Sequence, residues 1–216
     1  MASANLNLGD APGDDEPGSR YTATCGRVFF TTAEGGLRSL EPDESTRDWL
    51  PAGSAVRWPD GAGNLLTFAY GSPPQVHVLD LESGAFVAVD PTDSPQLRPR
   101  VSGTSIIWED ERSGYAQVWR REQDGEAFAV DPSSADQRFA VISKGRVVWT
   151  DFRAEGDDGR WSGDGSPMGG DLAIGATGIQ ADLPMIGLNS LVYTSVEGGA
   201  GQPLTRTMHV VPLPSL

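Results

Sequence analysis

The sequence predicts an all-β protein, a β-propeller of about five four-stranded blades whose ring is closed by an N-terminal strand. Three observations support this fold class. The 27 glycines and 16 prolines make up about a fifth of the 216 residues, which favours many short strands joined by turns. No window keeps an apolar period of 3.6 residues for three turns without meeting Gly or Pro, so helices are not expected. The third observation is an internal repeat of about 41 residues.

The repeat is clearest in two stretches that begin at Val101 and Ile142. Each has an apolar residue and Ser, a turn, an apolar strand that ends in Trp, and then x-Asp-x-Arg. A Val-Asp-Pro triplet precedes both stretches, and their tryptophans are 41 residues apart. The motif residues are Trp108, Asp110 and Arg112 in one copy and Trp149, Asp151 and Arg153 in the other. Fainter copies place Phe30, Phe68 and Tyr193 at the position of the tryptophan.

Each repeat unit predicts four short strands. In the third unit these are residues 98–101, 105–109, 116–121 and 127–130, with turn residues between them. A four-stranded sheet of this size cannot bury both of its faces alone, so such units pack face to face around an axis. The prediction is a single propeller domain over residues 1–216, with approximate blades at 20–52, 53–92, 93–132, 133–178, and 179–216 together with 4–8.

The N-terminal segment 4–8 enters this prediction because the last unit lacks a fourth strand before the chain ends. Residues 4–8 alternate polar and apolar side chains, as a half-buried strand does. Pairing there would close the ring and cover open sheet edges. The alternative interpretation is an acidic tail without structure.

The motif apolar-Ser-Gly-x-x-Ile-x-Trp-x-Asp-x-Arg at residues 101–112 is followed by a short aromatic strand and a Gly turn. It resembles the repeats of TolB-like β-propellers of bacterial secreted and cell-surface proteins. The resemblance is strong over residues 96–153, moderate over 50–95 and weak over the first and last units. It implies a propeller that contacts protein or carbohydrate, often outside the cytoplasm. The chain departs from the family in having about five units, where six or seven are common, and in an insertion in the fourth unit.

Charge and composition restrict the partners. The formal charge is −14, so a phosphate backbone is repelled and nucleic acid is not an expected partner. No segment has the roughly 20 apolar residues that cross a bilayer, so membrane insertion is not expected. The resemblance implies a periplasmic or cell-surface location. The N-terminus lacks the basic and apolar regions of a signal peptide, so the alternatives are a cytoplasmic protein or a signal that was removed. Cys25, the single cysteine, is expected to be a buried thiol beside an apolar strand.

The Trp-x-Asp-x-Arg residues are interpreted as structural. Asp110 with Arg112, and Asp151 with Arg153, have the residue types for a charge-assisted hydrogen bond that ties a turn to a neighbouring blade. A catalytic group is seldom needed once in every repeat, and the two tryptophans are expected to pack between blades. His77 and His209 fall in equivalent third strands and are expected to be strand residues rather than metal ligands.

The insertion at residues 155–171 is the predicted partner-binding segment, because long loops on rigid scaffolds often carry binding sites. It is expected to replace the start of the third strand of the fourth unit. Trp161 would serve as an anchor. The candidate contact residues are Trp161, Asp157, Asp158, Asp164 and Met168. Asp157, Asp158 and Asp164 are also a weak Ca²⁺ candidate, since their spacing does not match a calcium-binding loop. No other cofactor is indicated.

Three functions are compatible with these features. The favoured one is a non-catalytic binding or scaffold propeller that contacts a protein or glycan through its end loops. A second is a five-bladed glycoside hydrolase, in which carboxylates of Glu109, Asp110 and Asp151 would converge on a central funnel. A third is a lectin with one shallow glycan site in each blade. The direction of these carboxylates distinguishes the first two functions, since a structural role would turn them into the blade turns.

Overall fold

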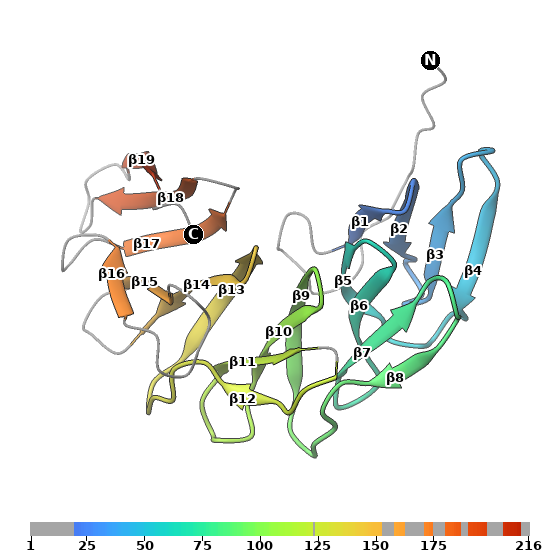
Figure 1. The fold of residues 1–216 in the computed structure, drawn as a ribbon, viewed down its shortest axis with the longest axis horizontal. Helices are drawn as coiled ribbons and strands as arrows, with labels where there is room; N and C mark the ends of the chain where they lie inside the picture. Colours follow the sequence, from blue (N-terminus) through green and yellow to red (C-terminus); the bar gives the residue numbers. More distant parts are fainter. Residues whose placement is uncertain are drawn as a thin grey trace. The chain divides into compact units, whose positions relative to one another are not determined.

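The computed structural model describes residues 20–122, 124–152, 158–162, 171–174, 180–186, 190–197 and 205–212, and all of its regular structure is β (Figure 1). The strands form five sheets, each built from strands that follow one another in the sequence. In the described part of the chain there is no helix long and apolar enough to cross a membrane. By their contacts the residues group into two compact parts, residues 1–106 and residues 107–216, each of which contains more than one repeat unit. Residues 4–8, predicted to close the ring, lie outside the described residues.

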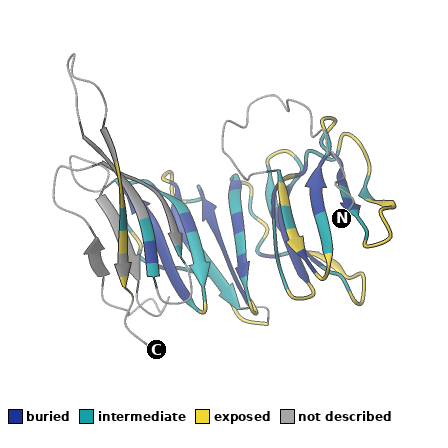
Figure 2. Cartoon of the chain, turned by 90° about the horizontal axis from the view of Figure 1, so that it is seen from above, coloured by how far each residue is buried: buried dark blue, intermediate teal, exposed yellow. Residues whose placement is uncertain are grey.

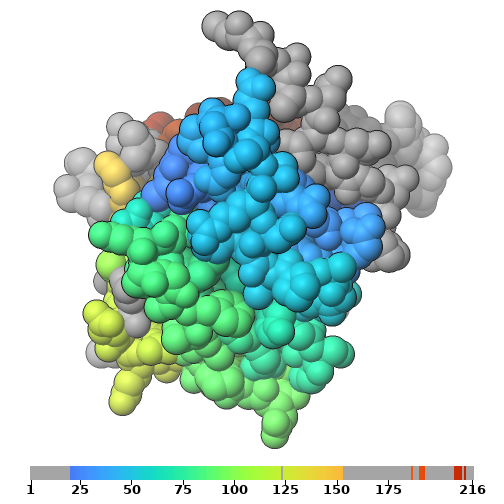
Figure 3. All heavy atoms as spheres, turned by 90° about the vertical axis from the view of Figure 1, so that its right-hand side faces the viewer, coloured from blue at the N-terminus to red at the C-terminus, as the bar shows by residue number. Residues whose placement is uncertain are grey.

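The compact part at residues 1–106 contains two complete antiparallel sheets and the first strand of the third sheet. The first sheet consists of β1 (Tyr21–Thr24), β2 (Arg27–Thr31), β3 (Leu37–Leu40) and β4 (Thr46–Leu50). The second consists of β5 (Arg57–Ala62), β6 (Leu65–Tyr70), β7 (Gln75–Asp80) and β8 (Phe86–Ala88). The strand β9 (Gln96–Ser102) follows. Exposed residues of the outer strands β4 (light blue) and β8 (green) lie at the surface in Figure 3.

The remaining sheets lie further along the chain. The third has the order β12-β11-β10-β9, with β10 (Ser105–Asp110), β11 (Gln117–Glu122) and β12 (Phe128–Ala129). The fourth consists of β13 (Gln137–Ser143), β14 (Arg146–Asp151), β15 (Asp158–Ser162) and β16 (Asp171–Ile174). The fifth has three described strands, β17 (Gln180–Ile186), β18 (Ser190–Glu197) and β19 (Thr205–Pro212).

The second strand of each sheet carries the repeat position that the sequence marks with an aromatic residue. Phe30, Phe68, Trp108, Trp149 and Tyr193 lie in β2, β6, β10, β14 and β18. All six residues of β10 and of β14 are buried, and so are the first five of β6 (Figure 2). A strand in a sheet with one wet face would alternate, so continuous burial means that both faces of these sheets are covered. This confirms the prediction that the units stack face to face.

Apolar side chains fill the space between successive sheets. Within residues 1–106, Phe29 and Leu37 of the first sheet pack with Leu66 and Phe68 of the second sheet. Within residues 107–216, residues of β10 and β11 in the third sheet pack with residues of β13 and β14 in the fourth sheet, around fully buried Trp149. Trp149 therefore packs between two sheets, as the repeat predicted. Removing a buried aromatic side chain of this kind costs roughly 3–5 kcal/mol.

A bulge recurs near the start of the first strands and was not predicted. Trp58, Arg98 and Phe139 each have a positive φ, at 51°, 47° and 58°. The register shifts at this place between β5 and β6 and between β13 and β14. A bulge leaves one residue unpaired and bends its strand. The positive φ at these large side chains is a strained conformation, and the surrounding contacts must hold it.

Buried glutamines join the third strands β7 and β11 to the first strands of the sheets that follow them, β9 and β13. Gln96 of β9 is fully buried; its Oε1 accepts the N–H of Val76 in β7 at 2.9 Å and its Nε2 donates to the carbonyl of Asp90 at 2.7 Å. Gln137 of β13 repeats both contacts, with the N–H of Val118 at 3.1 Å and the carbonyl of Asp131 at 2.7 Å. We call these residues the glutamine latches.

A second glutamine supports each latch from the opposite strand. Gln75 accepts the N–H of Thr92 at 2.8 Å and donates to the carbonyl of Ser94 at 2.8 Å. Gln117 makes the same pair of contacts with Ser133 at 2.7 Å and Ala135 at 2.6 Å. The connecting segments 89–95 and 130–136 are therefore fixed by side chains at both ends.

Replacing Gln96 with Leu should lower the free energy of unfolding by about 2–4 kcal/mol, because the Val76 N–H and the Asp90 carbonyl both lose this buried partner. Urea denaturation followed by tryptophan fluorescence measures the change. Thr46→Ala, on an exposed edge strand, is the control and should leave stability nearly unchanged. Equal stability of Gln96→Leu and the wild type would contradict a latch role.

Candidate functional site

The first Trp-x-Asp-x-Arg copy closes on itself. Trp108 and Asp110 are fully buried, and the indole Nε1 of Trp108 donates to Asp110 Oδ2 at 3.0 Å. Arg112 donates to both carboxylate oxygens of Asp110, through Nε at 2.9 Å and Nη2 at 2.6 Å. The guanidinium of Arg112 also lies 3.9 Å from the centre of the Trp119 ring. The carboxylate of Asp110 thus ties the end of β10 to the turn that follows it.

The second copy repeats this arrangement in β14. Trp149 and Asp151 are fully buried, and the indole of Trp149 donates to Asp151 Oδ2 at 3.3 Å. The latch residue Gln137 also donates to this oxygen, at 3.4 Å. Arg153 lies outside the described residues.

The ion pair of Asp110 and Arg112 acts on the turn after β10. It joins the end of β10 to the turn that follows. One residue separates the partners, so the side chains meet over their own backbone. Among the described contacts, the glutamine latches, Glu109 and Asp60 connect one sheet to the next.

Glu109 is a fully buried carboxylate that sequence reasoning treated only as a catalytic candidate. Its Oε1 accepts the backbone N–H of Phe139 at 2.7 Å, at the bulge of β13. Its Oε2 lies 3.7 Å from Nη1 of Arg138. Glu109 therefore holds the strained bulge of the next sheet, whereas Asp110 and Asp151 bind the indoles of their own strands. The described contacts of these three carboxylates serve the scaffold.

Asp60 connects the second sheet to the third sheet. Its Oδ2, in the bulged strand β5, accepts the N–H of Val101 in β9 at 2.8 Å. Burial raises the pKa of Asp60, and this outweighs the opposing effects of Arg100 and of the backbone hydrogen bond. A carboxylate with a raised pKa is a candidate functional group. Here its hydrogen bond identifies it as a contact between two sheets.

The predicted binding insertion contains a strand. Asp158–Ser162 form β15, which pairs with β14 and β16, and Trp149 lies opposite Arg160. The expectation that a loop replaces the start of the third strand of this unit is therefore wrong. Trp161 occupies a register position between Val148 and Leu172. The side chains of Trp161 and Asp158 lie outside the described part of the chain, as do Asp157, Asp164 and Met168.

Cys25 and the two histidines can also be placed. Cys25 is exposed, at a φ of 50° in the turn between β1 and β2, so the prediction of a buried thiol is wrong. His77 lies in β7 opposite Phe68, and His209 lies in β19 opposite Tyr193, so both are in third strands as predicted. Among the residues that the structure describes, no three His, Cys, Asp or Glu side chains are grouped to hold a metal ion.

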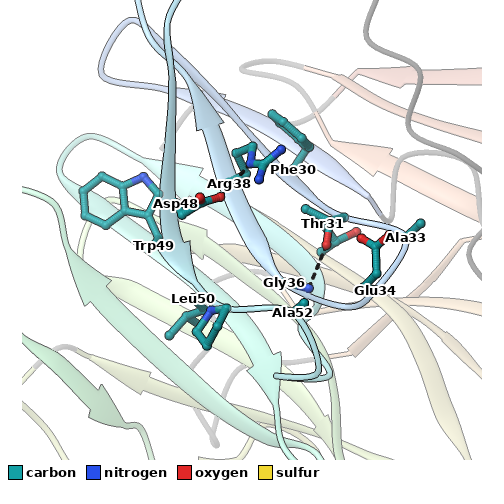
Figure 4. A pocket seen from close by; sticks show the side chains of 12 residues that line it. Phe30, Thr31, Ala33, Glu34, Gly36, Arg38, Asp48, Trp49, Leu50 and Ala52 are labelled. Atoms are coloured by element: carbon teal, nitrogen blue, oxygen red, sulfur yellow. Dashed lines mark hydrogen bonds and ion pairs between the residues drawn. The ribbon is translucent and has the colours of Figure 1, made fainter.

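A pocket of about 700 Å³ lies against the first sheet (Figure 4). It was not predicted, because its residues come from the faint first repeat. Its lining joins the end of β2 and the loop after it to β4 and the residues that follow. The lining residues are Phe30, Thr31, Thr32, Ala33, Glu34, Gly36, Arg38, Asp48, Trp49, Leu50, Pro51 and Ala52.

The pocket combines an ion pair with an apolar floor. Arg38 donates to Asp48 at 2.6 Å, and this partner raises the pKa of Arg38. Phe30 is buried, while Trp49 packs against the core behind it. Thr32 accepts the N–H of Gly36 at 3.0 Å, which shapes the loop at the mouth. The lining combines charged and hydroxyl side chains with apolar ones, an arrangement that suits binding of a small molecule.

The loop between β10 and β11 exposes an aromatic side chain that the sequence analysis did not single out. Tyr115 is 46% exposed. The hydroxyl of Ser113 donates to its carbonyl at 3.1 Å, and Gly114 has a φ of 86° in the same turn. The equivalent loop of the fourth sheet leads from β14 into β15. Exposed tyrosine on a braced loop is a common type of contact residue.

Comparison with known proteins supports the fold and not a family. No family model matches the chain, and no curated protein matches it in sequence. Among solved structures, TolB from Acinetobacter baumannii is similar with a TM-score of 0.55 at 12% identity, over 82% of this chain and 50% of that one. A TolB from Agrobacterium tumefaciens gives 0.55 at 19%, over 68% and 60%. The fold is a TolB-like β-propeller.

A third similar structure is a chain of a nidogen/laminin complex, with a TM-score of 0.54 at 16% identity over 84% of this chain and 77% of that one. The chain spans half to three fifths of the length of the two TolB structures. At these identities the likeness concerns the arrangement of the propeller sheets and not the residues of any site.

Asp110→Asn should lower the free energy of unfolding by about 2–4 kcal/mol, because a buried carboxylate that binds a guanidinium loses its charge. Asp48→Asn is a matched control, since its ion pair with Arg38 has the same 2.6 Å distance but is exposed. Its effect should be much smaller. Chemical denaturation of both variants measures the difference, and equal effects would contradict a structural role for Asp110.

Asp60→Asn should alter the pH dependence of stability. The raised pKa means that the folded state holds the proton of Asp60 more tightly than the unfolded state. Its contribution to stability is therefore full below the ordinary value near 3.8 and is lost as the pH rises through the folded pKa. Asparagine cannot lose a proton. In chemical denaturation from pH 3.5 to 7.5, the free energy of unfolding of the variant should therefore increase relative to that of the wild type as the pH rises. A constant difference would contradict the assignment.

Proposed function

We propose that the chain is a non-catalytic β-propeller that binds a protein partner through loops at one end of its sheets. The observation that carries this proposal is the use of the repeat carboxylates. Glu109, Asp110 and Asp151 are the acids that a funnel-type hydrolase would need, and each makes a structural hydrogen bond inside the scaffold. Such an interior supports a rigid platform, and the exposed loops remain for contact with a partner.

The contact surface is proposed to include Tyr115 and the fourth-unit segment. Tyr115 is an exposed aromatic residue on the loop between β10 and β11. Trp161, Asp157, Asp158, Asp164 and Met168 belong to the stretch after β14 that the sequence analysis selected. The nidogen/laminin complex supports a protein partner, because that similar propeller was crystallised with another protein.

The remaining features of the proposal follow from the repeat motif. We propose that the five sheets form one domain over residues 1–216 and that the repeats belong with those of TolB-like proteins. A bacterial protein with an extracytoplasmic location fits this assignment. The acidic composition favours a partner surface that is neutral or basic.

Photo-crosslinking tests the end-loop surface. A photoreactive phenylalanine analogue at position 115 should give a defined adduct with one protein in the cells that naturally produce the chain. The same analogue at Thr46, an exposed residue on the outer strand β4, should not give that adduct. Identical adducts from both positions, or none from position 115 while the protein is folded, would contradict the proposed surface.

A further inference from the structure

The outer strand β8 is an open, uncharged sheet edge. It forms the end of the second sheet, and no described strand pairs with it on the side away from β7. Phe86 is 40% exposed and Val87 is 56% exposed, so the strand presents apolar side chains on both faces of the sheet. Figure 3 shows this side of the compact part at residues 1–106, with β8 in green.

The backbone of β8 has groups that point outward. Val89 donates to the carbonyl of Val76, and Asp80 donates to the carbonyl of Ala85, each at 2.9 Å. Along an antiparallel edge strand, alternate residues bond to the neighbour and the residues between them face away. Phe86 and Ala88 therefore direct their N–H and carbonyl groups to the open edge. An extended peptide that pairs there would make the same hydrogen bonds as a fifth strand.

Two other described outer strands are protected against such pairing. The strand β4 carries Arg47 and Asp48, and β12 is two residues long and half-buried. Charged or very short edge strands prevent pairing with other chains. Of these three outer strands, β8 is the one that has neither device.

The side chain of Phe86 is held in place by other rings. It lies 4.8 Å from the ring of His77 and 5.8 Å from the ring of Phe68, nearly parallel to both. Tyr70 meets Phe86 edge-on at 5.8 Å. An exposed aromatic residue that is already ordered loses little entropy on binding, which favours it as an anchor.

Charge determines the kind of partner. Residues 75–95 contain Asp80, Glu82, Asp90 and Asp93 but no Lys or Arg. Hydrogen bonds from Ser83 lower the pKa of Asp80, so this carboxylate stays ionised at neutral pH. A second copy of the chain would bring the same acidic segment against itself, in a protein of net charge −14. A basic strand would meet opposite charge.

We propose that the edge of β8 binds an extended basic peptide segment of a partner protein, one that alternates Lys or Arg with apolar residues, by adding a strand to the second sheet. This surface is separate from the end loops, and the proposal does not depend on the proposed function.

The test uses a fluorescent eight-residue peptide of alternating Lys and Val and the full chain, with the dissociation constant measured by fluorescence anisotropy. Ala88→Pro removes an outward N–H and leaves the Val89 and Asp80 hydrogen bonds to and from β7 in place. It should weaken binding about tenfold. A peptide that is N-methylated at alternate residues keeps its charge and should also bind about tenfold more weakly.

A matched pair of charge variants tests the electrostatic part. The two variants are Glu82→Gln and Glu44→Gln. Glu82 lies in the turn between β7 and β8, and Glu44 lies in the equivalent turn between β3 and β4 of the first sheet. Only Glu82→Gln should weaken binding of the peptide. Circular dichroism confirms folding, and if Ala88→Pro does not fold, Phe86→Lys replaces it as the edge variant.

Three results would overturn the proposal. One is equal affinity of the folded edge variant and the wild type. Another is equal affinity for the N-methylated peptide, which would reduce the contact to charge alone. The third is a dimer in sedimentation that the edge variant converts to a monomer, which would make a second copy the occupant.

Discussion

Hydrogen bonds from buried side chains of one strand to the backbone of another hold the sheets of this protein in register. Apolar contacts between stacked sheets are strong but non-directional, and they would tolerate sliding of one sheet over the next. The glutamine latches at Gln96 and Gln137 do not tolerate it, because a shift would leave buried amide and carbonyl groups without partners. Asp60 and Glu109 add directional contacts at or near the bulged strands.

The bulge and the carboxylate belong to one device. Phe139 takes a positive φ that a large side chain rarely adopts, and the carboxylate of Glu109 accepts its N–H. The strain at the bulge is thus balanced by a charge-assisted hydrogen bond to a fully buried carboxylate. Asp110 acts in the same way on the indole of Trp108 and on Arg112. Acids that could serve chemistry elsewhere are engaged here in maintaining shape.

The residues that stabilise this scaffold are buried between its sheets, and they differ from the residues that it exposes to solvent. Tyr115 and Val87 are exposed and belong to neither core cluster, so they can change without loosening the sheets. The pocket beside β4 shows the same division, with Phe30 and Trp49 anchored in the sheet while the ion pair of Arg38 and Asp48 faces solvent.

Much of the site could not be read from the repeat motif, for identifiable reasons. The glutamines recur at 41 or 42 residues, at Gln75 and Gln117 and at Gln96 and Gln137, so the signal was present. It was missed because glutamine carries no strand propensity and no obvious chemistry. The strand β15 was missed because its neighbourhood is rich in Gly and Asp, which are rare in strands. Pairing with β14 overrides that weak local preference.

The sequence by itself determined the five-sheet plan, since apolar strands ending in an aromatic residue recur every 38 to 44 positions and cannot bury their faces singly. It also determined that Trp108, Trp149 and their aspartates belong to the scaffold. Only the tertiary structure decided which strand each polar side chain holds, whether Cys25 faces water, and which side chains the outer strand β8 exposes. Those outcomes depend on contacts between residues far apart in the chain, and local pattern does not encode such contacts.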